Sequence, residues 1–104
     1  MADPRKTLTP AEISDAALTG WRQDGETLTV RFATGDFVTG LDLINRIGDA
    51  AEAANHHPDL TLTYPEVTAT LTSHDVGGIT SRDVDLARVI SEHADTLGVA
   101  SSRD

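Results

Sequence analysis

Three of the four histidines in this 104-residue chain fall between regular elements, and imidazole is the side chain best suited to proton transfer near neutral pH. His56 and His57 are adjacent and precede Pro58, whereas His74 lies in the segment TSHDVGGI. Glu52 stands four residues before His56, within reach of it if both lie on one helix. Since the flanking segments are expected to form a hairpin, we expect the two histidine-containing loops to lie close together at its open end.

Clustered imidazoles are compatible with several kinds of chemistry. Zinc can bind three histidines and a water, but no HExxH motif or spaced histidine pair is present, which disfavours a metal site. Imidazoles can instead donate one proton and accept another. A polar pocket that only binds a ligand is a third interpretation, and histidines that meet the negative end of a helix dipole are a fourth. Ser73 and His74 are sequence neighbours, which is poor geometry for a nucleophile and its base, so no hydrolase triad is expected.

Capping signals predict three helices that must position these residues. Thr9 and Glu12 form a capping box at the start of a short helix that should end near residues 18–20. Thr80 and Asp83 form an acidic variant of the box, and capping accounts for Asp83 better than a role in a pocket does. Asp36 caps a long helix over residues 37–54, whose apolar stripe is expected to be Phe37, Leu41, Ile44, Ile47 and Ala51.

Alternating apolar residues predict strands between these helices. The expected strands are residues 21–23, 28–32, 60–64 and 67–71, with Asp24-Gly25 as a hairpin turn and Pro65 in a second turn. The order α-β-β-α-β-β-α favours an α+β fold, with an antiparallel sheet and the helices on one face. We expect a single domain over residues 1–104, with frayed tails at 1–7 and 99–104.

Composition excludes several classes of function. The chain has 17 acidic and 8 basic residues and a formal charge of −9, which argues against binding nucleic acid or anionic lipid. It has no cysteine, so disulfides and thiolate metal sites are excluded. No apolar run approaches the roughly 20 residues of a membrane helix, and the N-terminus lacks the apolar core of a signal peptide. A cytoplasmic protein is therefore expected.

The candidate residues form one string, Glu52-x3-His56-His57-Pro58-x5-Tyr64-x9-His74-x8-Asp83, that closely resembles the signature of the pterin-4a-carbinolamine dehydratases. The segments NHHP and LTSHDVGGITSRDVDLA are similar to the two most recognisable stretches of that family. The similarity runs from about residue 21 to residue 90. It departs where family members often carry aromatic residues and this chain has Thr34, Leu41 and Leu43.

The resemblance implies a fold, an assembly and a site. The fold is a four-stranded antiparallel sheet with three helices on one face, and the assembly is a homodimer or a homotetramer built from dimers. The implied catalytic residues are His56, His57 and His74, supported by the carboxylate of Glu52. The same three histidines are implied to line the pterin pocket together with Asn55, Thr72, Ser73 and Asp75.

The activity implied by the resemblance is dehydration of a 4a-hydroxytetrahydropterin to a quinonoid dihydropterin, in a cycle that serves a pterin-dependent hydroxylase. The reaction needs a proton on the departing hydroxyl and removal of a proton from the neighbouring ring nitrogen. Imidazoles can do both without a metal or an organic cofactor. The alternative is a non-catalytic pterin-binding or protein-interaction module on the same scaffold, which would have no need to keep all three histidines.

Overall fold

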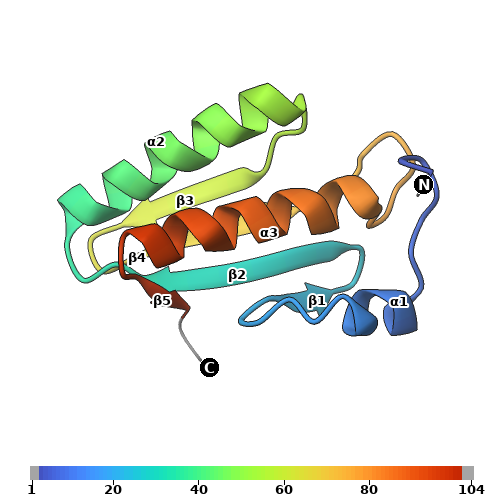
Figure 1. Cartoon of the computed structure of the whole chain (residues 1–104), viewed down its shortest axis with the longest axis horizontal. Helices are drawn as coiled ribbons and strands as arrows, with labels where there is room; N and C mark the ends of the chain where they lie inside the picture. The colour runs from blue at the N-terminus through green and yellow to red at the C-terminus, as the bar shows by residue number, and fades with distance from the viewer. Residues whose placement is uncertain (1–2, 102–104) are drawn as a thin grey trace.

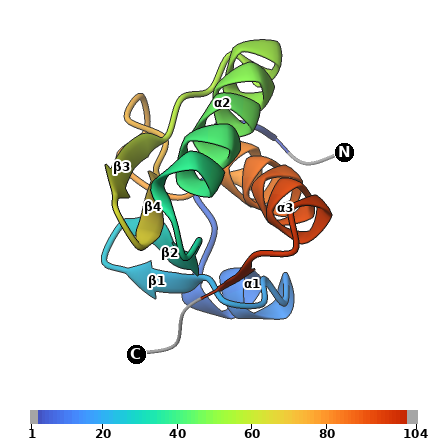
Figure 2. The ribbon, with the colours of Figure 1, turned by 90° about the vertical axis from the view of Figure 1, so that its left-hand side faces the viewer.

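The computed structural model describes residues 3–101, and it has the expected element order followed by one additional short strand (Figure 1). The elements are α1 (Pro10–Asp15), β1 (Arg22–Asp24), β2 (Thr27–Ala33), α2 (Phe37–Ala54), β3 (Asp59–Thr63), β4 (Glu66–Leu71), α3 (Ser81–Thr96) and β5 (Ala100–Ser101). The described strands pair antiparallel in the order β1-β2-β4-β3, with β5 also on β2. All three helices lie on the same face of the curved sheet (Figure 2), which confirms the α+β prediction.

The core lies between the inner face of the sheet and the helices. In β2 and β4 every second residue is buried, as the alternation predicts, and Val30 pairs with Ala69 in the antiparallel register. Ile47 of α2 and Ile90 of α3 are fully buried in the same cluster. None of the helices formed by residues 3–101 is both long and apolar enough to cross a membrane.

Helix α2 has the predicted bounds, but the predicted apolar stripe is partly wrong. Phe37 is 49% exposed and Leu41 is 45% exposed. The buried positions are Gly40, Leu43, Ile47 and Ala51. Gly40 explains the difference, because a Cβ there would lie 2.6 Å from Leu62 Cδ1 of β3. A glycine allows this side of the helix to approach the sheet closely, so the side with Phe37 and Leu41 faces outward.

Two predicted boundaries are displaced. Helix α1 has the expected capping box but ends at Asp15, because Ala17 adopts a left-handed conformation with φ of 53°. The β1–β2 turn is Gly25-Glu26, one residue later than expected, with Asp24 paired to Thr27. Gly25 has φ of 60°, a conformation that glycine adopts without steric cost. The capping box of Thr80 and Asp83 in α3 is confirmed.

The ends of the described chain are attached to the fold, unlike the frayed tails that we expected. After Gly98, with φ of 71°, Val99 is buried and β5 pairs with Phe32 and Ala33 of β2. At the other end, the Leu8 N–H donates a 2.8 Å hydrogen bond to the Ile79 carbonyl. Residues 1–2 and 102–104 of the expected tails lie outside the described residues.

Candidate active site

The end of α2 directs the two adjacent histidines to different sides. Asn55 ends the helix in the left-handed conformation, with φ of 50° and ψ of 42°. The next amide, from His56, donates a 3.1 Å hydrogen bond to the Ala51 carbonyl, which closes the last turn as in a Schellman motif. The chain therefore leaves the helix axis at Asn55, and His56 no longer occupies a helical position above Glu52.

His56 meets a buried carboxylate of α3. Its Nε2 lies 2.5 Å from Asp83 Oδ1; the His56 side chain is 11% exposed and that of Asp83 is fully buried. The other carboxylate oxygen of Asp83 accepts hydrogen bonds from Ser73 Oγ at 2.8 Å and from the Thr80 N–H at 2.9 Å. Asp83 thus caps α3 and also orients His56, so this carboxylate has a second role besides capping.

His57 has a carboxylate partner as well, but in an exposed setting. Its Nε2 lies 2.6 Å from Glu52 Oε2, and the two side chains are 57% and 78% exposed. The spacing placed Glu52 within reach of His56, but in the structure Glu52 binds His57 and His56 binds Asp83. The left-handed turn at Asn55 explains why Glu52 binds His57 and not His56, because it rotates His56 toward α3 and brings His57 back over the last turn of α2.

The loop that carries His74 is linked to the end of α2 through Asp83 of α3. Ser73 is fully buried, and its hydroxyl contacts both Thr80 Oγ1, at 2.8 Å, and the Asp83 carboxylate that binds His56. His74 follows directly, with an exposed side chain. One buried carboxylate therefore connects the His56 side chain to the residue that precedes His74.

The residues implied to line a pterin pocket have varied surroundings. Asn55 ends α2, and the Thr72 hydroxyl donates a 2.7 Å hydrogen bond to the Glu26 carbonyl. Ser73 points inward to Asp83, whereas Asp75 accepts a 2.8 Å hydrogen bond from Arg82. That hydrogen bond is the main cause of the lowered pKa of Asp75. Contact of these residues with a pterin stays a prediction.

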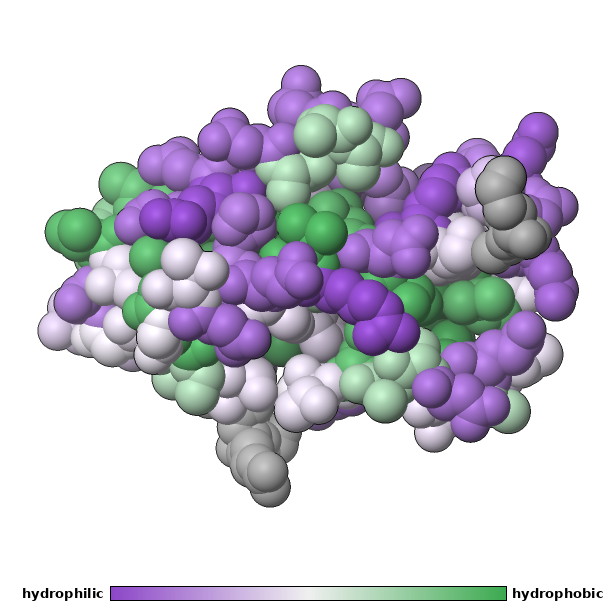
Figure 3. Space-filling model, viewed as in Figure 1, coloured by the Kyte–Doolittle hydropathy of each residue, from purple (hydrophilic) through white to green (hydrophobic). Residues whose placement is uncertain are grey.

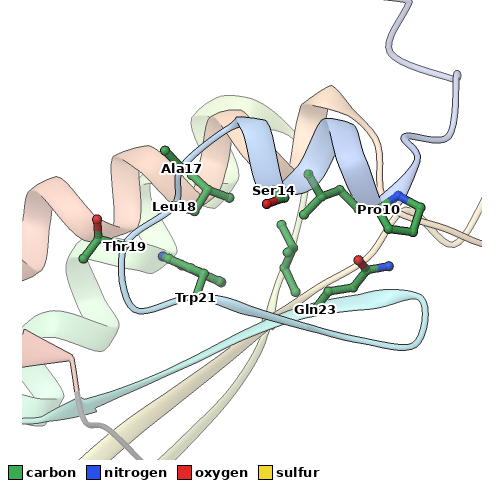
Figure 4. Close-up of a pocket in the computed structure, with 9 residues that line it drawn as sticks. Pro10, Ser14, Ala17, Leu18, Thr19, Trp21 and Gln23 are labelled. Atoms are coloured by element: carbon green, nitrogen blue, oxygen red, sulfur yellow. The ribbon is translucent and has the colours of Figure 1, made fainter.

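A pocket of about 460 Å³ borders His56 between α2 and α3. Its walls are mostly apolar, and green surface is visible between the two helices in Figure 3. The lining residues are Ala50, Ala53, Ala54, His56, Arg82, Asp85, Leu86 and Val89. A second pocket of about 410 Å³ lies between α1 and β1 and includes Trp21 (Figure 4), but none of the predicted site residues lines it.

The sequence analysis attributed Asp83 to capping, although Asp83 also ends the string that resembles the family signature, and Arg82 was not predicted to belong to the site. A signal for Asp83 was present, because it shares the buried face of α3 with Ala87 and Ile90, where a carboxylate requires a partner. Nothing in the spacing indicated Arg82, which binds both the Pro4 carbonyl, 78 positions earlier, and Asp75. Among residues 3–101, no group of three or more histidine or acidic side chains is arranged to hold a metal ion.

The fold and the site together define a small α+β protein with two histidine–carboxylate pairs where α2 meets the His74 loop. Residues 6–93 match the family model described as pterin 4 alpha carbinolamine dehydratase, and the chain belongs to this family. A protein of Thermosynechococcus vestitus that bears the pterin-4-alpha-carbinolamine dehydratase name is 49% identical over 84% of this chain and 94% of its own. A protein of Koribacter versatilis with the same name is 43% identical over 84% of this chain and 95% of its own.

Solved structures show the same fold. A transcriptional coactivator/pterin dehydratase from Brucella melitensis superposes with a TM-score of 0.81 at 32% sequence identity. The match covers 86% of this chain and 99% of that one. A pterin dehydratase-like protein that is a RuBisCO assembly factor in the alpha-carboxysome has a TM-score of 0.53 at 22% identity and shares the fold alone.

Proposed function

We propose that the chain catalyses dehydration of a 4a-hydroxytetrahydropterin, in the cytoplasm and without a metal or organic cofactor. The C4a–O bond breaks and the hydroxyl leaves as water with a proton supplied by the enzyme. A second proton is removed from the neighbouring ring nitrogen, which forms the quinonoid dihydropterin. The enzyme therefore has the same number of protons before and after the reaction. The product can re-enter a cycle that regenerates a tetrahydrobiopterin-type cofactor.

The observation that carries this proposal is the pair of adjacent imidazoles, each oriented by its own carboxylate. Both use Nε2 for the carboxylate, so Nδ1 of each ring is available to a substrate. A carboxylate on one ring nitrogen fixes the orientation of the imidazole, as in other histidine-based sites. His56, held by a buried partner, is the more rigidly placed of the two, and His74 can supply the third imidazole.

The test is a turnover assay on enzymatically generated carbinolamine. General acid–base catalysis is worth about 10²–10⁴-fold, so His56→Ala or His57→Ala should lower kcat at least about tenfold. Adding His74→Ala to either should remove nearly all activity. Circular dichroism checks that each variant folds, and chelator treatment should leave the wild-type rate unchanged. A folded His56→Ala/His74→Ala variant with full activity would refute the assignment.

A second candidate is an interaction module without catalysis. The observation in its favour is the Brucella relative, which is described as a transcriptional coactivator as well as a pterin dehydratase. Against it stands the orientation of both imidazoles by carboxylates, which binding to another protein does not require. A wild-type rate equal to the spontaneous rate of dehydration would favour the module.

A further inference from the structure

The first described residues lie against the loop that carries His74. We call residues 3–8 the N-terminal strap and residues 72–79 the His74 loop. Besides the hydrogen bond from the Leu8 N–H to the Ile79 carbonyl, Thr7 packs closely on the loop. A Cβ added to Gly78 would lie 3.0 Å from Thr7 Cγ2, so a glycine accommodates the strap there. The blue strap passes beside the orange loop in Figure 1.

Arg82, in the first turn of α3, joins these two segments. Its Nε donates a 2.7 Å hydrogen bond to the Pro4 carbonyl of the strap. Its terminal nitrogen donates a 2.8 Å hydrogen bond to Asp75 Oδ1 of the loop. The Arg82 side chain is 30% exposed and also lines the pocket that His56 borders. One guanidinium therefore fixes the strap and the loop relative to the start of α3.

His74 depends on such support more than the other two histidines do. Its side chain is exposed and, among the described residues, has no hydrogen-bond partner of its own. Ser73 and Ile79 anchor the ends of the loop in the core, but residues 74–77 between them are at least partly exposed and include Gly77. Within the loop, the Val76 and Gly77 amides donate hydrogen bonds to the Ser73 carbonyl. Arg82, through Asp75 next to His74, supplies the side-chain hydrogen bond that joins the middle of the loop to α3.

We propose that Arg82 and the N-terminal strap position His74 for the dehydration, an inference that rests on the proposed function. Arg82 is a positioning residue in this scheme, because it acts on the substrate through the placement of His74. The strap holds Arg82 from its outer side through the Pro4 carbonyl. Misplacing a reacting group by about 1 Å can cost about 10²-fold in rate, so a loosened loop has a measurable effect.

A kinetic double-mutant cycle tests the positioning role. In the wild-type background, Arg82→Gln should lower kcat about tenfold and change KM less than about threefold. In the His74→Ala background the same substitution should change kcat less than about twofold, because the imidazole that it misplaces is gone. Arg82→Lys should resemble Arg82→Gln, since one ammonium group cannot bond Pro4 and Asp75 in the geometry of the guanidinium.

Amide hydrogen exchange measures the hold on the loop without any assay of activity. The Leu8 amide bonds Ile79 and the Gly77 amide bonds the Ser73 carbonyl at 3.0 Å, so both should exchange about tenfold faster in Arg82→Gln. The Ile90 amide, in the core of α3, should be unchanged. Arg88→Gln is the matched control, because Arg88 lies on the same helix and donates to the Ala16 carbonyl, far from the His74 loop.

The outcomes separate this proposal from the proposed function. Unchanged amide exchange in Arg82→Gln would overturn the positioning role. So would an Arg82→Gln variant whose kcat falls by the same factor in the His74→Ala background as in the wild-type background. A large rise in KM at unchanged kcat would make Arg82 a substrate contact and would also overturn it. If the wild-type protein does not turn over the carbinolamine, the proposed function fails, and exchange alone decides whether Arg82 holds the loop.

Discussion

The carboxylates of Asp83 and Glu52 both bind a histidine, yet their surroundings give these pairs different energetic weight. Asp83 is fully buried and serves three donors, whereas Glu52 is 78% exposed. Removing one partner of a buried pair typically costs about 3–5 kcal/mol, because polar groups are left buried without a partner. An exposed pair contributes about 0–1 kcal/mol. The two sites are therefore expected to differ in stability as well as in rigidity.

We predict that Asp83→Ala lowers the free energy of unfolding by about 3 kcal/mol or more, and that Glu52→Ala lowers it by less than about 1 kcal/mol. Urea denaturation followed by circular dichroism measures both. Asp83→Asn keeps one side-chain oxygen and the shape of the side chain but removes the charge. Its loss in free energy of unfolding should lie between those of Asp83→Ala and Glu52→Ala. Similar losses for Asp83→Ala and Glu52→Ala would contradict this account of the site.

The sequence was sufficient to select the three histidines of the candidate site but not to predict the partners of two of them. Loop position and chemistry singled out His56, His57 and His74, and topology brought their loops together. The exchange of partners between His56 and His57 depends on one left-handed residue, Asn55, whose conformation spacing alone does not specify. Spacing assumes that a helix continues, and here the helix ends one residue before the histidines.

At the scale of elements, α2 contains two glycines with opposite surroundings. A Cβ at Gly40 would meet Leu62 Cδ1 at 2.6 Å, whereas a Cβ at Gly48 would have nothing within 4 Å. Both positions lie inside the helix, where alanine is favoured over glycine by about 1 kcal/mol. Only at Gly40 does close packing on the sheet oppose that preference.

We predict that Gly48→Ala raises the free energy of unfolding by about 0.5–1 kcal/mol. Gly40→Ala should lower it by about 1 kcal/mol, because the overpacking cost of about 1–3 kcal/mol exceeds the gain in helix propensity. Each variant serves as the control for the other, and urea denaturation midpoints report both values. Stabilisation by Gly40→Ala would show that Leu62 moves aside without cost.

The close packing of Gly40 on Leu62 also explains why the bounds of the helices and strands were predicted better than the side of α2 that faces the sheet. The caps of α2 and α3 and the alternation in β2 and β4 are local signals, and the structure confirms them. Which side of α2 faces the sheet depends on a contact between Gly40 and Leu62, which are far apart in sequence. Strand β5 was missed for a similar reason, because two residues carry no periodicity.

At the scale of the whole molecule, large exposed apolar side chains gather at one end. Phe37, Val38 and Leu41 lie at the start of α2, and Val38 is 77% exposed. Tyr64 lies in the β3–β4 turn, whose Pro65 carbonyl bonds the segment just before α2. In Figure 3, green surface marks the start of α2 at the left. A clustered apolar patch of this kind is typical of an interaction surface.

We predict that the protein forms a homodimer or a homotetramer and that this patch takes part in the assembly. Sedimentation velocity at micromolar concentration should therefore show an oligomer. Val38→Glu should reduce the sedimentation coefficient toward that of a monomer without changing the circular dichroism spectrum, since the side chain is not in the core. Thr19→Glu, which adds the same charge in an exposed loop, should leave the assembly intact. A monomeric wild-type protein would contradict the prediction.

The position of the N-terminal strap has a practical consequence for fusion proteins. Pro4 lies close to the His74 loop, since its carbonyl accepts a hydrogen bond from Arg82, which also binds Asp75. Strand β5 lies away from the end of α2 and from the His74 loop (Figure 1). We therefore expect a purification tag or a fluorescent partner to disturb the candidate site less at the C-terminus than at the N-terminus.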